Sequence, residues 1–328
     1  MELVCPASGV LAGPWSHRVT ATEAVVRWDG CSDTAPGSIT LTPEAGGGAS
    51  VRAGTRFASE VTTLYAGFAG VPPDVPGTYL LNEVALTGLS PGTCYRYSVD
   101  AEPLREGRFC TARASGESFR FMAIGDTNPA ISRCEEILER ALTEAPDFTL
   151  HLGDIQYYTS VLDSWSQWFL SMQPMLSGGA FFPSIGNHES ELPTEYEDYY
   201  GRLFAQAGFA GPDTAIALAP NGPQGIWLTP ALEQAASSPG FRGSVLFMHR
   251  TLITVGDSGS EPALRALWEP VFSANGVVLV LQGHMHGYER FDVPGITYVT
   301  SAGGGGLLGD VNENVETRPE EAALRVAP

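Results

Sequence analysis

The chain has 328 residues, of which 43% are hydrophobic and 10% aromatic, which is enough for packed cores and argues against wholesale disorder. Its formal net charge of −19 argues against nucleic acid as a partner, because the phosphate backbone would be repelled, and against adhesion to anionic lipid. No apolar run is long enough to span a bilayer, and the opening MELVCP lacks the charged start and long apolar stretch of a signal peptide. We therefore expect a soluble chain of two domains, or one large one.

Residues 1–113 have the pattern of β-structure. EAVVRW is a β-branched run followed by a turn-rich stretch, and a later strand alternates apolar and polar positions after the turn at Pro91-Gly92. The apolar face of this second region carries Leu89, Tyr95, Tyr97 and Val99. The segment resembles a fibronectin type III-like all-β sandwich, with Tyr95 as the expected tyrosine corner. His17 is expected on the surface of this sandwich.

Four of the five cysteines lie in the first third of the chain, and an even cluster there suggests disulfides and an oxidising compartment. Cys94 and Cys110 lie equally far from a predicted hairpin tip near Glu102-Pro103, so they are expected to pair across the hairpin. Cys5 and Cys31 would form the second bridge. The alternative is a set of buried thiols in a reduced domain. The disulfide interpretation predicts a secreted or periplasmic protein.

A small-residue segment, TARASGES at 111–118, is the expected linker, and it separates residues 1–113 from residues 114–328. Beyond it, strands and helices alternate, which favours an α/β domain with mostly parallel pairing. The expected strands are FRFMAIG, DFTLHLG, AFFPSIG, GSVLFMH, GVVLVLQ and ITYVTSA, and the expected helices are ISRCEEILERALTEA, VLDSWSQWFLSMQPML and EPALRALWEPVF. The acidic tail after Gly309 is poorly patterned and is expected to pack loosely.

Five of these strands are followed by side chains that can bind metal. The donors are Asp126, Asp154, Asn187 with His188, His249, and His284 with His286. Ligands of open α/β sheets lie at the carboxyl ends of strands, so one fold could gather all of these side chains. One donor after a strand would mean little, since an aspartate there is often a helix cap. Five in order predict a metal site.

These blocks resemble the calcineurin-like metallophosphoesterase superfamily, and more narrowly the purple acid phosphatases. GDIQY places Tyr157 three residues after Asp154, as in the Gly-Asp-x-x-Tyr motif of that group, and GHMHGYER is similar to its Gly-His-x-His-x-Tyr-Glu-Arg block. The glycine run SAGGGG is also typical. The resemblance covers about residues 118–310 and implies a central β-sandwich flanked by helices.

The resemblance implies two adjacent metal ions bridged by Asp154. A ferric ion would be held by Asp126, Asp154, Tyr157 and His286. A divalent ion would be held by Asp154, Asn187, His249 and His284. The ligand chemistry agrees, because the first set has three hard oxygen donors and the second is richer in imidazole, which suits Zn²⁺, Fe²⁺ or Mn²⁺.

The sequence departs from the purple acid phosphatase pattern in two places. The first motif normally runs Asp-x-Gly, or Asp-x-His in relatives without the tyrosine, whereas here it is Asp126-Thr127-Asn128. Asn128 could hydrogen-bond a ligand or contact the metal, which leaves the occupant of that site open. Plant members also carry a further histidine pair that has no counterpart after His249, so their substrate pocket cannot be transferred.

The resemblance predicts a metal-dependent phosphatase that hydrolyses small phosphate monoesters by attack of a metal-bound hydroxide. Asn187 would stabilise the developing charge and His188 would protonate the leaving alkoxide. Arg250 is a candidate for contacting the substrate phosphate, although an arginine beside a ligand is as often structural. His151 is expected to be packed or to support a ligand, while Tyr288, Glu289 and Arg290 are expected to brace the His284/His286 loop.

Two alternatives remain open from the sequence. The same metal core could serve a phosphodiesterase or a nucleotide hydrolase, because the ligands do not select between esters. The chain could also be a non-catalytic extracellular binding protein whose sandwich does the work and whose metal site is vestigial. The sequence does not predict the natural substrate or the oligomeric state.

Overall fold

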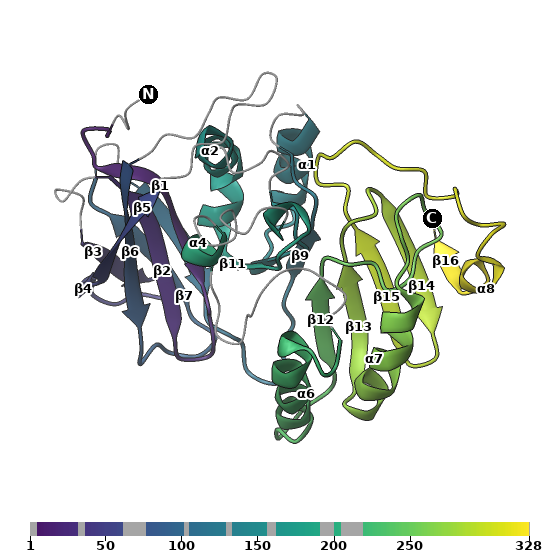
Figure 1. Cartoon of the computed structure of the whole chain (residues 1–328). Helices are drawn as coiled ribbons and strands as arrows, with labels where there is room; N and C mark the ends of the chain where they lie inside the picture. The colour runs from purple at the N-terminus through teal and green to yellow at the C-terminus, as the bar shows by residue number, and fades with distance from the viewer. Residues whose placement is uncertain are drawn as a thin grey trace.

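The computed structural model describes residues 5–31, 37–61, 77–101, 105–128, 133–155, 162–190, 200–204 and 219–327 (Figure 1). Within these ranges the strands form three sheets. A seven-stranded sheet has the order β5-β6-β2-β1-β11-β10-β9, a five-stranded sheet the order β12-β13-β15-β14-β16, and a four-stranded sheet the order β4-β3-β7-β8.

The first part of the chain, in its described residues, consists of strands joined by turns and loops. Its strands are β1 (Val10–His17), β2 (Ala24–Gly30), β3 (Ser38–Pro43), β4 (Ser50–Ala53), β5 (Thr55–Val61), β6 (Gly77–Leu86), β7 (Cys94–Val99) and β8 (Arg105–Cys110). In β7 the buried positions alternate, and the hydroxyl of Tyr95 accepts a hydrogen bond of 2.9 Å from the backbone N–H of Ser90. A hydroxyl that returns to the backbone a few residues upstream is the contact expected of a tyrosine corner. The fibronectin type III likeness and the boundary near residue 113 stay predictions.

Both expected disulfides are present. Cys94 and Cys110 lie directly opposite each other on β7 and β8 and are bonded, and Cys5 is bonded to Cys31. The predicted hairpin tip at 102–104 lies outside the described residues. Cys134 is a buried free thiol. Two disulfides are consistent with an oxidising compartment.

The N-terminal strands and the α/β part share one sheet. β1 pairs in parallel with β11 (Ala180–Pro183) and antiparallel with β2, so it lies between strands from the two parts of the chain (Figure 1). Trp15 of β1 is fully buried and its ring lies 5.2 Å from that of Phe169 and 5.7 Å from that of Phe204. One aromatic core therefore contains residues from both parts of the chain.

The predicted alternation of strands and helices is confirmed in the α/β part. Two strands, β9 (Phe121–Ile124) and β10 (Phe148–His151), extend the first sheet beyond β11, and the three strands run parallel. The helices that follow β9 and β10 are α1 (Arg133–Leu142) and α2 (Leu162–Gly178). The short helices η1 (His188–Ser190) and α4 (Gly201–Phe204) follow β11. The strands of the second sheet are β12 (Ser244–Met248), β13 (Val277–Gln282), β14 (Tyr288–Val293), β15 (Ile296–Ser301) and β16 (Arg325–Ala327). The helices in this part of the chain are α6 (Pro223–Ala236), α7 (Pro262–Ala274) and α8 (Pro319–Ala322).

An apolar layer joins the two large sheets. Leu150 of β10 and Leu152, which directly follows this strand, pack against Leu281 of β13. Buried residues of α1 and α2 belong to the core on the first sheet, and those of α7 to the core on the second. The expected central β-sandwich flanked by helices is therefore what the α/β part forms.

Two expectations from the sequence are wrong. His17 is fully buried instead of exposed, because it continues the buried face of β1, and burial together with the charges of Arg27 and Arg18 lowers its pKa well below the usual value. The tail after Gly309 is anchored instead of loose. Arg318 donates to the carbonyl of Thr254 at 2.9 Å and β16 pairs with β14. Side-chain bonds to backbone carbonyls fix this tail, and such bonds leave no apolar periodicity in the sequence.

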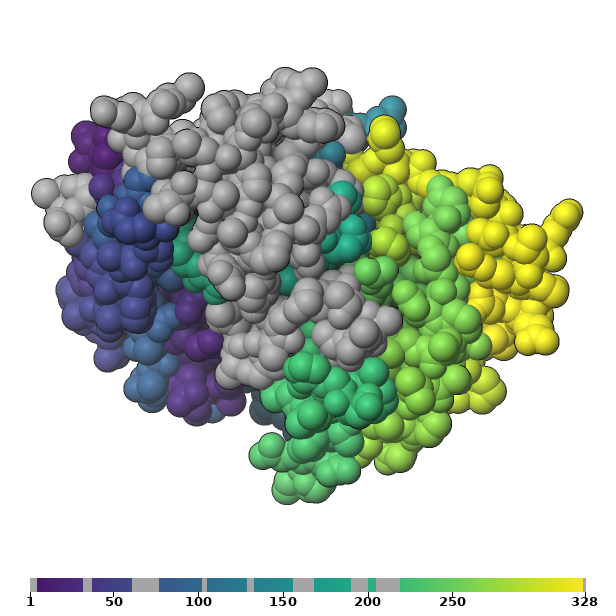
Figure 2. Space-filling model, viewed as in Figure 1, coloured from purple at the N-terminus to yellow at the C-terminus, as the bar shows by residue number. Residues whose placement is uncertain are grey.

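In the space-filling view the N-terminal strands and the C-terminal tail occupy opposite sides of the molecule (Figure 2). The helices in the described ranges are all too short or too polar to cross a bilayer.

Candidate metal centre

The predicted donors meet at one edge of the two large sheets. Strands β9, β10 and β11 run parallel with Ile124, His151 and Pro183 in register, so the loops that follow them begin side by side. Strands β12 and β13 are also parallel, with Met248 opposite Gln282. Since the carboxyl ends of parallel strands share an edge, the loops after all five strands converge.

The tightest part of the cluster contains Asp154, His249 and His284. One ligand atom from each of the three lies within 4.8 Å of the other two, and Asp154 and His249 are buried. The Oδ1 atom of Asn187 lies 2.9 Å from the Nε2 atom of His249, which brings the fourth predicted member of this set into place. A carboxylate, an amide oxygen and two imidazoles form a donor set that suits a divalent transition metal.

A second group of donors adjoins the first. The Nε2 atom of His286 lies 3.3 Å from Oδ1 of Asp126, and the other carboxylate oxygen of Asp126 accepts the backbone N–H of His284 at 3.0 Å. Nδ1 of His286 donates to the carbonyl of Leu307 at 2.7 Å. The Asp126 carboxylate raises the pKa of His286 to about 8. Tyr157, the remaining residue of the predicted ferric set, lies outside the described residues.

The hydrogen bonds of His249 test whether a cation fits between these donors. Its Nδ1 atom lies 2.9 Å from the carbonyl oxygen of Leu152, which can only accept, so Nδ1 carries the proton. Its Nε2 atom faces two oxygens, Oδ1 of Asn187 at 2.9 Å and Oδ1 of Asp154 at 3.4 Å. A nitrogen and two oxygens converge here, and these are donor atoms that transition-metal ions bind in proteins. The residues therefore fit a bound metal ion.

The backbone of the site is also unusual. Asp126, Asp154 and His284 all adopt positive φ angles, of 59°, 48° and 69°. Non-glycine residues rarely enter this region, and those that do cluster at functional sites. Gly186 is required for packing as well, because a Cβ atom there would overlap the carboxylate of Asp154.

A buried polar network links the first two loops beneath the donors. The hydroxyl of Thr127 donates to the carbonyl of Ile155 at 2.8 Å and accepts from Nε1 of Trp168 at 3.1 Å. His151 contacts the same hydroxyl through Nε2 at 3.0 Å, and burial lowers the pKa of His151 to about 3, so its ring is neutral. The prediction that His151 is a packed, supporting residue is confirmed.

Glu189 is a buried carboxylate that the sequence analysis did not single out. It accepts three backbone N–H groups, those of Asp154 and Ile155 in the loop after β10 and that of Gly186 in the loop after β11. Burial and the neighbouring Asp154 charge raise the pKa of Glu189 to about 8. The sequence signal for Glu189 is its place in the GNHE block, directly after the predicted site residues Asn187 and His188.

Two further side chains support the loop after β12. Gln282 accepts the backbone N–H of Leu252 at 2.8 Å, and Glu289 accepts the hydroxyl of Thr254 at 2.5 Å. Glu289 therefore braces the 254–255 segment, and not the histidine loop that the sequence suggested. Arg290 pairs with Asp292, and the Tyr288 side chain is half exposed.

The remaining predicted residues lie around the cluster. The backbone N–H of His188 donates to Oδ1 of Asp154 at 3.0 Å, and its Nε2 lies 3.8 Å from Oδ2 of the same carboxylate. Arg250 lies 3.9 Å from Glu261 and is partly exposed. Asn128, the residue that departs from the family motif, is buried.

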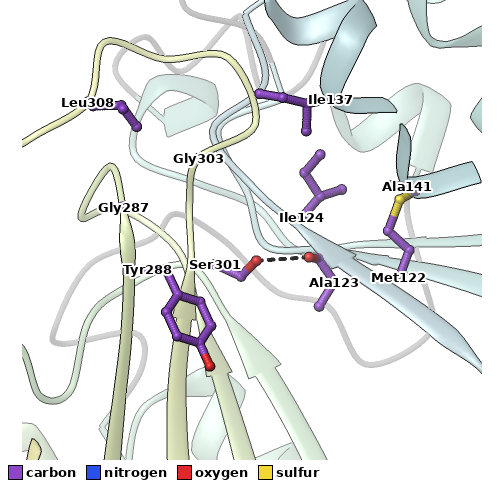
Figure 3. A pocket seen from close by; sticks show the side chains of 10 residues that line it. All are labelled: Met122, Ala123, Ile124, Ile137, Ala141, Gly287, Tyr288, Ser301, Gly303 and Leu308. Carbon is purple, nitrogen blue, oxygen red and sulfur yellow. Dashed lines mark hydrogen bonds between the residues drawn. The ribbon is translucent and has the colours of Figure 1, made fainter. Parts of the chain in front are cut away.

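An apolar groove of about 300 Å³ lies beside the glycine run (Figure 3). Ile137 and Ala141 of α1 form one side, and Gly303 and Leu308 lie across from them. The hydroxyl of Ser301 donates to the carbonyl of Ala123 at its floor. The groove is lined by none of the predicted metal ligands, so it is separate from the cluster.

The family of this chain is shown by its sequence match. The family model described as calcineurin-like phosphoesterase matches residues 119–288, more than half of the chain, and the chain belongs to that family.

Two relatives and two solved structures are similar to most of this chain. The uncharacterized proteins Rv2577 and MT2654 of two Mycobacterium tuberculosis strains are each 27% identical over 340 residues, which cover 83% of this chain and 60% of theirs. The purple acid phosphatase PPD1 from yellow lupin seeds matches with a TM-score of 0.68 at 17% identity, covering 91% of this chain and 65% of that one. The structure of PhoD matches with a TM-score of 0.59 at 13% identity, covering 93% and 79%. The chain thus spans about 60% of the length of the mycobacterial relatives.

Proposed function

We propose that this protein hydrolyses phosphate monoesters at a dinuclear metal centre, in the manner of a purple acid phosphatase. Asp126, Asp154, Tyr157 and His286 would hold a ferric ion, and Asp154, Asn187, His249 and His284 a divalent ion such as Zn²⁺, Fe²⁺ or Mn²⁺. The observation that carries the proposal is the convergence of donor atoms, in which Nε2 of His249 lies 2.9 Å from Oδ1 of Asn187 and 3.4 Å from Oδ1 of Asp154. Family membership supports the same chemistry.

A bound pair of cations neutralises phosphate charge and lowers the pKa of water so that it can attack phosphorus. The chain's own residues then have three tasks. Asn187 turns its amide oxygen toward His249, which leaves the amide N–H groups to donate to a phosphate oxygen. His188 is partly exposed beside Asp154 and can give a proton to the leaving alkoxide. Arg250 follows His249 and supplies a positive charge that would bind the substrate phosphate.

The proposed substrate is a small phosphate ester, and the proposed location is secreted or periplasmic. The lupin match is described as a purple acid phosphatase, which supports a phosphatase with similar chemistry here. The two disulfides support an oxidising compartment. The non-catalytic alternative is disfavoured by the close approach of donor atoms, since ligand atoms of Asp154, His249 and His284 lie within 4.8 Å of one another and Nε2 of His286 lies 3.3 Å from Oδ1 of Asp126.

Paired assays test the choice of ester. We expect kcat/KM on 4-nitrophenyl phosphate to exceed that on bis(4-nitrophenyl) phosphate by about tenfold or more, because a monoester presents more phosphate charge to the cations and to Arg250. Protein loaded with iron and zinc or with manganese should be compared on both substrates, with a chelated sample as the blank. A preference for the diester would overturn the monoesterase proposal and favour a phosphodiesterase or nucleotide hydrolase.

A further inference from the structure

Glu189 joins two of the loops that carry metal ligands. Its Oε2 atom accepts the backbone N–H of Asp154 at 3.1 Å and that of Gly186 at 2.8 Å, and its Oε1 atom accepts the N–H of Ile155 at 2.7 Å. Asp154 is the proposed bridging ligand, and Gly186 immediately precedes Asn187. A single buried side chain therefore holds the backbone at Asp154 on one loop and at Gly186, next to Asn187, on the other.

The contacts of Glu189 depend on its two side-chain oxygens. Both oxygens act as acceptors toward N–H donors, and an amide at this position would turn an NH₂ group toward at least one of them. The loops that Glu189 joins are also held tightly elsewhere, since Asp154 has a positive φ of 48° and its carboxylate accepts the N–H of His188. A left-handed aspartate needs such fixed surroundings to persist.

Two other buried glutamates have different surroundings. Glu289 lies 3.6 Å from Arg325, and Glu321 lies 3.3 Å from Arg265 and accepts the hydroxyl of Ser260. Neither accepts the backbone N–H of a predicted ligand in the contacts that the structure describes. Glu321 therefore provides a matched control, as a buried glutamate outside the ligand-bearing loops.

We propose that Glu189 is a positioning residue of the metal centre, which sets the separation of Asp154 and Asn187 through its three backbone hydrogen bonds. This role rests on the proposed function, because it concerns the same site. Side chains that orient metal ligands from behind typically change metal affinity by about 10- to 100-fold when they are altered. Glu189 contacts neither the metal nor the substrate in this proposal.

Titration of metal-free protein with Mn²⁺ tests the proposal without relying on turnover. Glu189→Gln is expected to raise the Kd for Mn²⁺ by about 10- to 100-fold, while Glu321→Gln leaves it near the wild-type value. At saturating Mn²⁺ the kcat of Glu189→Gln on 4-nitrophenyl phosphate should recover most of the wild-type value, because every ligand side chain is retained. If Glu189→Gln does not fold, Glu189→Asp keeps the carboxyl group but is too short for all three bonds, and should show the same direction of change.

Wild-type Mn²⁺ affinity in Glu189→Gln or Glu189→Asp would overturn the positioning role. An equal loss of affinity in Glu321→Gln would also overturn it, since the effect would then reflect general destabilisation. Wild-type protein that neither binds Mn²⁺ nor hydrolyses either nitrophenyl ester would instead refute the proposed function itself, and this role would fall with it.

Discussion

Residues 114–328 produced without the first 113 residues are expected to aggregate and to show no cooperative unfolding transition. Strand β1 lies between β2 and β11, so the deletion leaves β11, which is paired on both sides in the whole chain, as an exposed edge of a three-stranded sheet. It also removes Trp15 from contact with Phe169 and Phe204. Circular dichroism during heating and size-exclusion chromatography measure the outcome.

A single substitution tests whether the α/β part depends on β1 without removing the N-terminal strands. Trp15→Ala should lower the free energy of unfolding by about 3–5 kcal/mol, as truncation of a fully buried aromatic does, whereas Trp227→Ala, at a residue 49% exposed, should have a much smaller effect. The deletion would also remove Asp29, which pairs with Arg202 of α4 at 2.9 Å. A soluble 114–328 fragment with a sharp melting transition would show that the N-terminal strands are dispensable for folding.

Asp154→Ala is expected to reduce kcat on 4-nitrophenyl phosphate by about 10³-fold, because loss of the bridging ligand removes several kcal/mol of charge stabilisation from the transition state. In the structure the Asp154 carboxylate lies 3.4 Å from Nε2 of His249 and accepts the backbone N–H of His188. Stopped assays at saturating metal measure the remaining rate.

The matched control for this substitution is Asp292→Ala. Asp292 is an exposed aspartate on β14 that pairs with Arg290, away from the donors. It should keep the wild-type kcat within a factor of about two. Near wild-type turnover by Asp154→Ala would contradict the assignment of the bridging ligand.

Much of the α/β part could be predicted from the sequence because its signals are local. Apolar runs such as GVVLVLQ and amphipathic runs such as ISRCEEILERALTEA correspond to β13 and α1. The donors could be located because each lies within five residues of the end of a strand, and their convergence follows from parallel pairing. The disulfide of Cys94 and Cys110 was predictable from hairpin symmetry.

Features that depend on distant partners could not be predicted in this way. The sharing of one sheet by β1 and β11 depends on a pairing between Ser16 and Ala180, residues far apart in the sequence. Glu189 accepts N–H groups from two loops, and a buried acceptor leaves no periodicity in the sequence. His17 was misjudged because the hydropathy of one histidine does not show which face of its strand is buried.

Metal analysis of the purified protein, with a visible spectrum of the same sample, tests the central claim most directly. The account predicts about two metal ions per chain, one of them iron, and a purple tyrosinate absorption if Tyr157 binds the ferric ion. Two divalent ions without colour would keep the dinuclear centre but remove Tyr157 from it. Fewer than about one ion per chain after incubation with iron, zinc and manganese, with no hydrolysis of either nitrophenyl ester, would contradict the account.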